Sequence, residues 1–159
     1  MRGDKPEPFF HTPNVDERHP SFSPDGHWIA YSSNESGIFQ IYVRPFPGTP
    51  SGGKWQISNS GGMYPVWSHN SRELFYRTAD NQMMVAHYSV NGDSFVRENP
   101  REWSETRLAN IGPVANYDIA PDGKRIIAIL PGGPAEQKAE HLVILLNFFD
   151  ELRRRVPVK

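Results

Sequence analysis

Histidines are the residues of this chain best suited to acid–base catalysis or to metal binding. No two of them stand at the spacing with which metal ligands recur, and the sequence contains no cysteine. Disulfides, thiolate sites and a cysteine nucleophile are therefore excluded. We expect structural or surface roles for the histidines, with no metal and no cofactor. The six histidines are His11, His19, His27, His69, His87 and His141.

Local catalytic signatures are also absent from the sequence. There is no G-x-S-x-G nucleophile elbow, no H-E-x-x-H zinc helix and no G-x-x-x-x-G-K-[ST] phosphate loop. A serine, a histidine and a carboxylate from distant positions can still assemble in a fold, but the sequence offers too many candidates to choose among them. The sequence therefore predicts a protein without catalytic residues of its own.

Two carboxylates stand in a repeated setting that indicates a structural role. Asp25 and Asp122 each lie in a Pro-Asp-Gly turn and are followed by Gly26 and Gly123. An aspartate in such a turn accepts hydrogen bonds from backbone N–H groups, and the glycine adopts a positive φ without strain. We therefore predict that these four residues fix hairpins rather than transfer protons.

These turns belong to a segment that occurs three times along the chain. PSFSPDGHWIAY (20–31) recurs as PVWSHNSRELFY (65–76) and as YDIAPDGKRIIA (117–128), with 45 and then 52 residues between equivalent serine or alanine positions. Short apolar runs bounded by Gly, Pro, Asn and Asp are typical of strands, and this period is typical of four-stranded propeller blades. The sequence therefore predicts an all-β fold, a β-propeller with three four-stranded blades.

The predicted organisation is a single partial β-propeller domain over residues 1–159. An orphan outer strand at 7–12 precedes the first blade, and a short helix at 148–156 follows the third blade, where a fourth strand is missing. One orphan strand and one vacancy are complementary, so we expect strand 7–12 of one copy to complete the third blade of another. The blades are expected at 20–58 (strands 20–23, 28–33, 38–44 and 54–58), 64–109 (strands 64–68, 73–78, 83–90 and 105–109) and 116–147 (strands 116–120, 125–130 and 141–147).

The repeated segment resembles the TolB-like, or WD-repeat-like, β-propeller repeats, whose blades open with P-x-[WF]-S-P-D-G-x-x-I-A-[FY]. The first copy matches this pattern almost throughout. The second copy has His69-Asn70-Ser71 in place of Pro-Asp-Gly, and the third has Ala120 in place of the serine. The resemblance covers about residues 15–147 and implies that the three blades form half of a six-bladed propeller.

The segment LLNFFDELRRRVP, at 145–157, is similar to the end of large bacterial, acidobacterial-type proteins in which such repeats often follow a serine/threonine kinase. The kinase motifs do not occur in this sequence. The resemblance therefore implies the C-terminal part of a larger bacterial protein. The compartment stays open between cytoplasm and periplasm, because a chain without cysteine suits both and no signal peptide is visible.

The resemblance implies a non-catalytic module for protein–protein interaction or ligand sensing, with a protein or peptide as its partner. One alternative is a propeller domain that belongs to, or assists, a hydrolase, peptidase or lyase. Another is a self-assembling half-propeller that dimerises through its blade edges into a closed ring, since a three-blade arc leaves two apolar faces exposed.

The positions just before the innermost strand of each blade are the candidate binding rim, because a propeller presents them at the mouth of its channel. The alternative is that they are ordinary solvated loop residues, since their types differ from blade to blade. The rim residues are Glu17, Arg18, His19, Met63, Tyr64 and Asn116.

Charge and hydropathy argue against two classes of partner. The formal net charge is −1, and the aromatic residues lie on predicted strands, so we expect no nucleic acid. The apolar run at 142–149 is far shorter than the roughly 20 residues that a membrane span needs, so we expect no membrane insertion.

Overall fold

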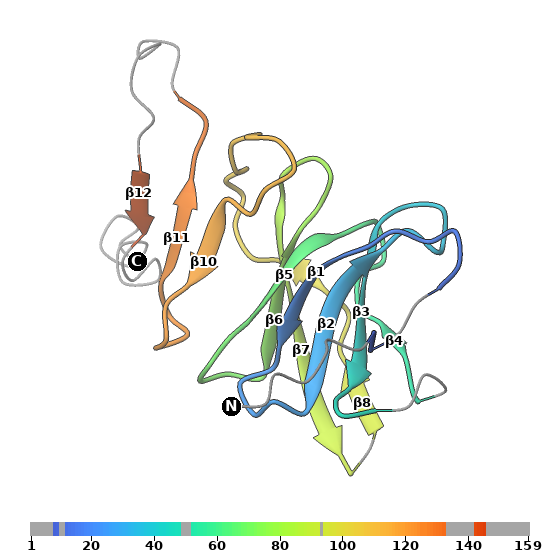
Figure 1. Ribbon diagram of the computed structural model, residues 1–159. Coiled ribbons are helices and arrows are strands. Elements are labelled where there is room, and N and C mark those ends of the chain that lie inside the picture. Colours follow the sequence, from blue (N-terminus) through green and yellow to red (C-terminus); the bar gives the residue numbers. More distant parts are fainter. Residues whose placement is uncertain (1–7, 10–11, 49–51, 93, 133–141, 146–159) are drawn as a thin grey trace, which may run out of the picture.

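The computed structural model describes residues 8–9, 12–48, 52–92, 94–132 and 142–145. These residues form an all-β structure of three antiparallel sheets that follow one another in chain order (Figure 1). Blue and cyan strands form the first sheet, green and yellow strands the second, and orange to brown strands the third. No helix in the described part of the chain is long and apolar enough to cross a membrane.

The first sheet is a four-stranded meander in the order β1-β2-β3-β4. Strand β2 has the predicted bounds of 28–33, because its apolar residues are framed by the turns at 24–27 and 34–37. The other strands differ by a few residues from their predicted bounds, and β4 is shorter than the predicted 54–58. The strands are β1 (Glu17–Phe22), β2 (Trp28–Ser33), β3 (Gln40–Pro45) and β4 (Trp55–Gln56).

The second sheet has five strands, and its outer part differs from the prediction. The predicted strand at 105–109 is wrong, because no strand forms there. Strand β7 instead turns back near Gly92, at φ 57°, into β8, and β9 then pairs with the first half of β7. The strands are β5 (Met63–Trp67), β6 (Glu73–Arg77), β7 (Met83–Asn91), β8 (Ser94–Arg97) and β9 (Arg101–Glu102).

The third sheet has three strands, β10 (Tyr117–Ile119), β11 (Ile126–Ile129) and β12 (Leu142–Leu145). Strands β10 and β11 are shorter than predicted, and residues 141, 146 and 147 of the predicted strand 141–147 lie outside the described residues. The predicted helix at 148–156 lies outside the described residues. Half of the predicted strand at 7–12 also lies outside them, and its described residues 8, 9 and 12 are not in a strand.

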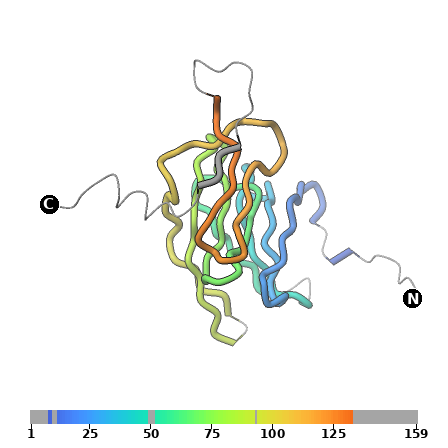
Figure 2. Tube along the Cα trace, turned by 90° about the vertical axis from the view of Figure 1, so that its left-hand side faces the viewer, coloured from blue at the N-terminus to red at the C-terminus, as the bar shows by residue number. Residues whose placement is uncertain are grey.

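Two apolar cores lie between the sheets, one between the first and second sheets and one between the second and third. Because side chains alternate across a strand, Leu74 and Tyr76 of β6 pack toward the first sheet, and Phe75 packs toward the third. The second sheet is therefore buried on both faces. A third cluster around Tyr31 and Tyr42 lies on the other face of the first sheet. Figure 2, turned by 90°, shows the orange hairpin of the third sheet in front of the green second sheet.

The first strands of the sheets adjoin one another, since β5 contacts both β1 and β10. Trp67 Nε1 donates a hydrogen bond of 3.0 Å to the Ser21 carbonyl, which ties the second sheet to the first. The Tyr117 hydroxyl donates to the Tyr64 carbonyl, which ties the third sheet to the second. These contacts fix the relative positions of the predicted rim residues. Asn116 precedes β10 as predicted, but the other five lie within β1 or β5 rather than before them, because these strands begin earlier than predicted.

Candidate functional site

The predicted rim residues lie at one end of the three sheets, but only some of them meet. His19, Tyr64 and Asn116 are connected through Arg77, the last residue of β6, which the sequence analysis did not select. We call these four residues the three-sheet cluster.

The remaining rim residues lie outside the three-sheet cluster. Glu17 accepts a hydrogen bond of 2.9 Å from the Thr12 hydroxyl. Arg18 forms an ion pair with Asp16. Met63 packs against the core between the second and third sheets.

Two members of the cluster have an unusual backbone conformation. His19 has φ 55° and Tyr64 has φ 59°, in the left-handed region that is uncommon for residues other than glycine and least expected for a bulky residue such as Tyr64. Each stands just before a proline and within a register irregularity of its strand pair, between Arg18 and Ser21 in β1 and between Met63 and Val66 in β5. The two sheets therefore share one local distortion, which directs both aromatic rings to the same place.

Contacts within the cluster connect all three sheets. The ring centroids of His19 and Tyr64 lie 4.2 Å apart, and the Arg77 Cζ lies 4.5 Å from the Tyr64 ring centroid. Arg77 Nη1 donates a hydrogen bond of 3.0 Å to Asn116 Oδ1. The amide nitrogen of Asn116 donates to the Ala109 carbonyl at 2.6 Å, which fixes the orientation of this amide.

Arg77 is a buried cation without an ionic partner in the described part of the chain. Its exposed fraction is 3 %, and it forms none of the ion pairs found among the described residues. Its Nε is the one buried side-chain polar atom of those residues that lacks a hydrogen-bond partner. Burying a charge without an ionic partner is unfavourable in free energy, and the contacts given above do not explain why Arg77 is buried.

A comparison of the repeats contains a signal for Arg77. Its equivalents at the end of the second strand of each repeat are Ser32 and Ile129, which carry no charge. The structure places Ser32 opposite Arg18 and Arg77 opposite Met63, just before the two irregularities. A charge at a position that is neutral in the other copies could have been noticed, although its burial depends on the packing of the third sheet.

His19 is held in its neutral form near pH 7. Its partial burial lowers the pKa, and the positive charges of Arg18 and Arg77 lower it further, against a smaller opposing effect of Asp16. Its Nδ1 lies 3.4 Å from the Ser32 hydroxyl. Ser32 is fully buried, so this pair does not present a nucleophile to a substrate.

The Pro-Asp-Gly turns lie at the opposite ends of the first strands. Asp25 Oδ1 accepts from the backbone N–H of His27 at 3.1 Å, and Asp122 Oδ1 accepts from that of Lys124 at 3.0 Å. Gly26 and Gly123 have φ values of 71° and 67°. Partial burial favours a raised pKa of Asp25, but hydrogen bonds from Ser23 and His27 outweigh it and hold this pKa below its usual value. These carboxylates are engaged in their turns.

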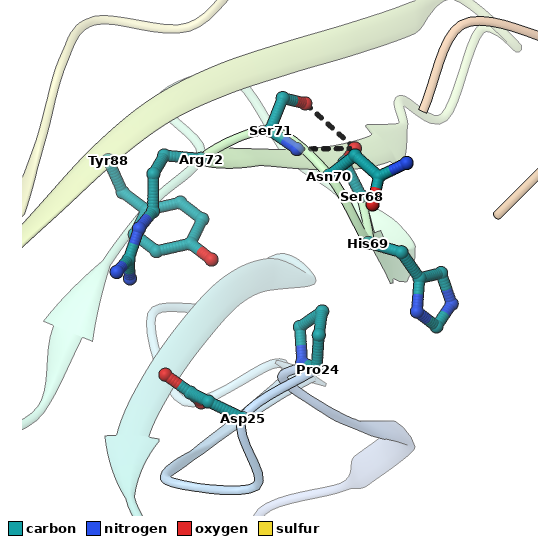
Figure 3. Close-up of a pocket in the computed structure, with 8 residues that line it drawn as sticks. All are labelled: Pro24, Asp25, Ser68, His69, Asn70, Ser71, Arg72 and Tyr88. Carbon is teal, nitrogen blue, oxygen red and sulfur yellow. Dashed lines mark hydrogen bonds between the residues drawn. The ribbon is translucent and has the colours of Figure 1, made fainter. Parts of the chain in front are cut away.

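An open hollow of about 230 Å³ lies between the turns of the first and second sheets (Figure 3). In its wall Ser71 donates two hydrogen bonds to the Ser68 hydroxyl, from its backbone N–H and from its own hydroxyl. Arg72 lies with its Cζ 5.7 Å from the Tyr88 ring centroid. Among the described residues, no buried side-chain polar atom of this hollow lacks a hydrogen-bond partner, in contrast to the Nε of Arg77.

The described residues form no metal centre, since no three or more His, Cys, Asp or Glu side chains gather among them at positions that could hold an ion. No protein-family model matches the sequence, and no curated protein matches it either.

Proposed function

We propose that the three sheets are blades of a TolB-like β-propeller and that the chain is a binding module of a larger bacterial protein. Three consecutive antiparallel sheets, each starting with the repeated segment and packed with adjoining first strands, support this arrangement. In it, β1, β5 and β10 line the central channel, and the three-sheet cluster lies at one mouth of that channel.

The observation that carries the proposal is the convergence of His19, Tyr64 and Asn116 from three different sheets around Arg77. Aromatic rings, a cation and an amide in one place suit a peptide, which offers carbonyl groups, charges and apolar side chains together. Backbone strain at two of these residues also favours a binding role, because such strain is concentrated at functional sites. The ligand is therefore a peptide or a peptide segment of a protein partner.

The test is selection of peptides from a random heptapeptide library displayed on phage, followed by affinity measurement with the labelled peptides. We expect His19→Ala and Tyr64→Leu to weaken the selected peptides at least tenfold, because His19 is the partly exposed ring of the cluster and the buried Tyr64 ring holds both His19 and Arg77 in place. His27→Ala is the matched control, since this histidine lies in a turn at the other end and its side chain is 72 % exposed. Circular dichroism establishes that each variant is folded. Affinities unchanged in both ring variants would refute a binding role for this end.

A second candidate function is self-association, and exposed apolar side chains on both outer sheets favour it. Phe22, in β1, is 57 % exposed and packs edge-on against Phe46 on the outer face of the first sheet. Ile127, in β11, is 38 % exposed and lies between two residues that face the inner core. We propose that a second copy of this chain covers these faces and closes a six-bladed ring.

A further inference from the structure

Arg77 is the feature of the molecule that neither the fold nor the repeats explain. A buried guanidinium normally has a carboxylate partner, because the attraction compensates for the loss of hydration. Arg77 has the Tyr64 ring and the Asn116 oxygen instead, and its Nε–H has no acceptor among the described residues. A hydrogen-bond donor and a full positive charge thus remain without a partner in the same place.

The neighbouring arginine makes a useful comparison. Arg18 lies at the same end and also acts on His19, but its charge is paired with Asp16. The carboxylate that could pair with Arg77 is absent from the described residues. The cluster therefore carries one positive charge, on Arg77, that a single bound anion would neutralise.

The geometry of the other groups defines which anion fits. The buried Tyr64 ring lies against the guanidinium, and the half-buried His19 ring lies beside Tyr64 at an interplanar angle of 45°. A planar carboxylate matches the planar donor array of arginine. His19 is the half-buried member of the cluster and the other three residues are each 3 % exposed, so we expect a ligand to enter beside the His19 ring.

We propose that the three-sheet cluster binds a carboxylate group of its peptide ligand, with Arg77 as the residue that recognises the charge. This inference rests on the proposed binding function and specifies the ligand chemistry of the same site. The carboxylate accepts from Arg77 Nε, which is left unpaired in this structure. Asn116 holds the guanidinium in place through its side-chain oxygen.

The experiment is an NMR titration of the labelled full chain with three probes. These are acetyl-Gly-Gly-Phe with a free C-terminal carboxylate, the same peptide as its C-terminal amide, and acetyl-Gly-Asp-Phe-amide with a side-chain carboxylate. We expect saturable shifts of the Arg77 Nε–H resonance with one or both carboxylate probes and none with the neutral amide. The two carboxylate probes tell a chain terminus from an acidic side chain as the source of the anion.

A second readout is the titration of His19, because a bound anion beside it stabilises the imidazolium ion. We expect its pKa to rise when a carboxylate probe is bound and to be unaffected by the neutral amide. A purely structural role of Arg77 would not couple His19 to the charge of a probe.

Substitutions separate recognition from folding. Arg77→Met keeps an apolar stem of similar length, and we expect at least a tenfold loss of carboxylate affinity, because the guanidinium is removed. The variant also leaves Asn116 Oδ1 without this donor, so circular dichroism and the melting temperature are measured alongside to establish that it is folded. Arg107→Met is the matched control, since it removes an arginine that is paired with Asp80 and 55 % exposed.

Two outcomes would overturn the inference. One is equal binding of the carboxylate and amide probes, and the other is unchanged carboxylate affinity in the Arg77→Met variant. If phage-selected peptides still depend on His19 in that case, the proposed binding function survives and only its anionic ligand class fails.

Discussion

Single residues show how far the candidate site could be selected from the sequence. His19, Tyr64 and Asn116 could be selected because they occupy equivalent positions in the three repeats, and the structure brings them to one end of the sheets. Arg77 could not be selected in the same way, because a charged residue at a strand end is ordinarily solvated. In the structure it is buried against Tyr64 of the second sheet and Asn116, which precedes the third.

The pKa of His19 gives a prediction at this scale. Burial and the charges of Arg18 and Arg77 lower it, so we expect the folded chain to titrate His19 below the value of about 6.5 for an unfolded histidine. The unfolded state then binds more protons in the window between the two pKa values. The stabilisation associated with neutral His19 is present above the unfolded pKa and is lost as the pH falls through the folded pKa.

Imidazole NMR of the folded chain, together with urea unfolding between pH 7 and pH 5, measures this effect. His19→Gln removes the ionisable group and is expected to flatten the pH dependence of the unfolding free energy. A folded His19 that titrates at or above the unfolded value would contradict the electrostatic description of the cluster.

At the scale of elements, the sequence predicts inner strands better than outer ones. Strand β2 is predicted at its observed bounds, since turn residues delimit it on both sides. The outer part of the second sheet is mispredicted because β7 continues to Asn91 and the chain then turns at Gly92 so that β8 pairs with β7, where the sequence predicts a loop. The hairpin is stabilised when Phe95, which is 2 % exposed, enters the core between the first two sheets.

Gly62 gives a prediction about how these two sheets meet. A Cβ atom at this position would lie 2.8 Å from Ile41 Cγ1 and 2.9 Å from Tyr76 Cδ2, which are core atoms of the first and second sheets. We expect Gly62→Ala to lower the free energy of unfolding by about 1–3 kcal/mol, because the sheets must move apart. Urea denaturation measures the change, with the exposed Ser60→Ala as control. Equal stability of the two variants would mean that the sheets tolerate wider spacing.

At the scale of the whole molecule, the three sheets form a stack whose middle member is buried on both faces. The repeats predict such stacking, because each copy places apolar residues on both faces of its strands. They do not reveal which apolar residues stay exposed at the two ends of the stack. Phe22 and Ile127 are identified only by their exposure in the structure.

Ring closure by a second copy predicts a dimer of about twice the 18.1 kDa chain mass, measured by size-exclusion chromatography with light scattering. Ile127→Lys is expected to shift the equilibrium toward the monomer, because a lysine on the outer face of the third sheet must be desolvated when the faces meet. Val96→Lys is the matched control, since Val96 is 52 % exposed on β8 in the second sheet. A monomer at every concentration would refute ring closure by self-association. A dimer weakened equally by both lysines would place the interface elsewhere than at the end faces.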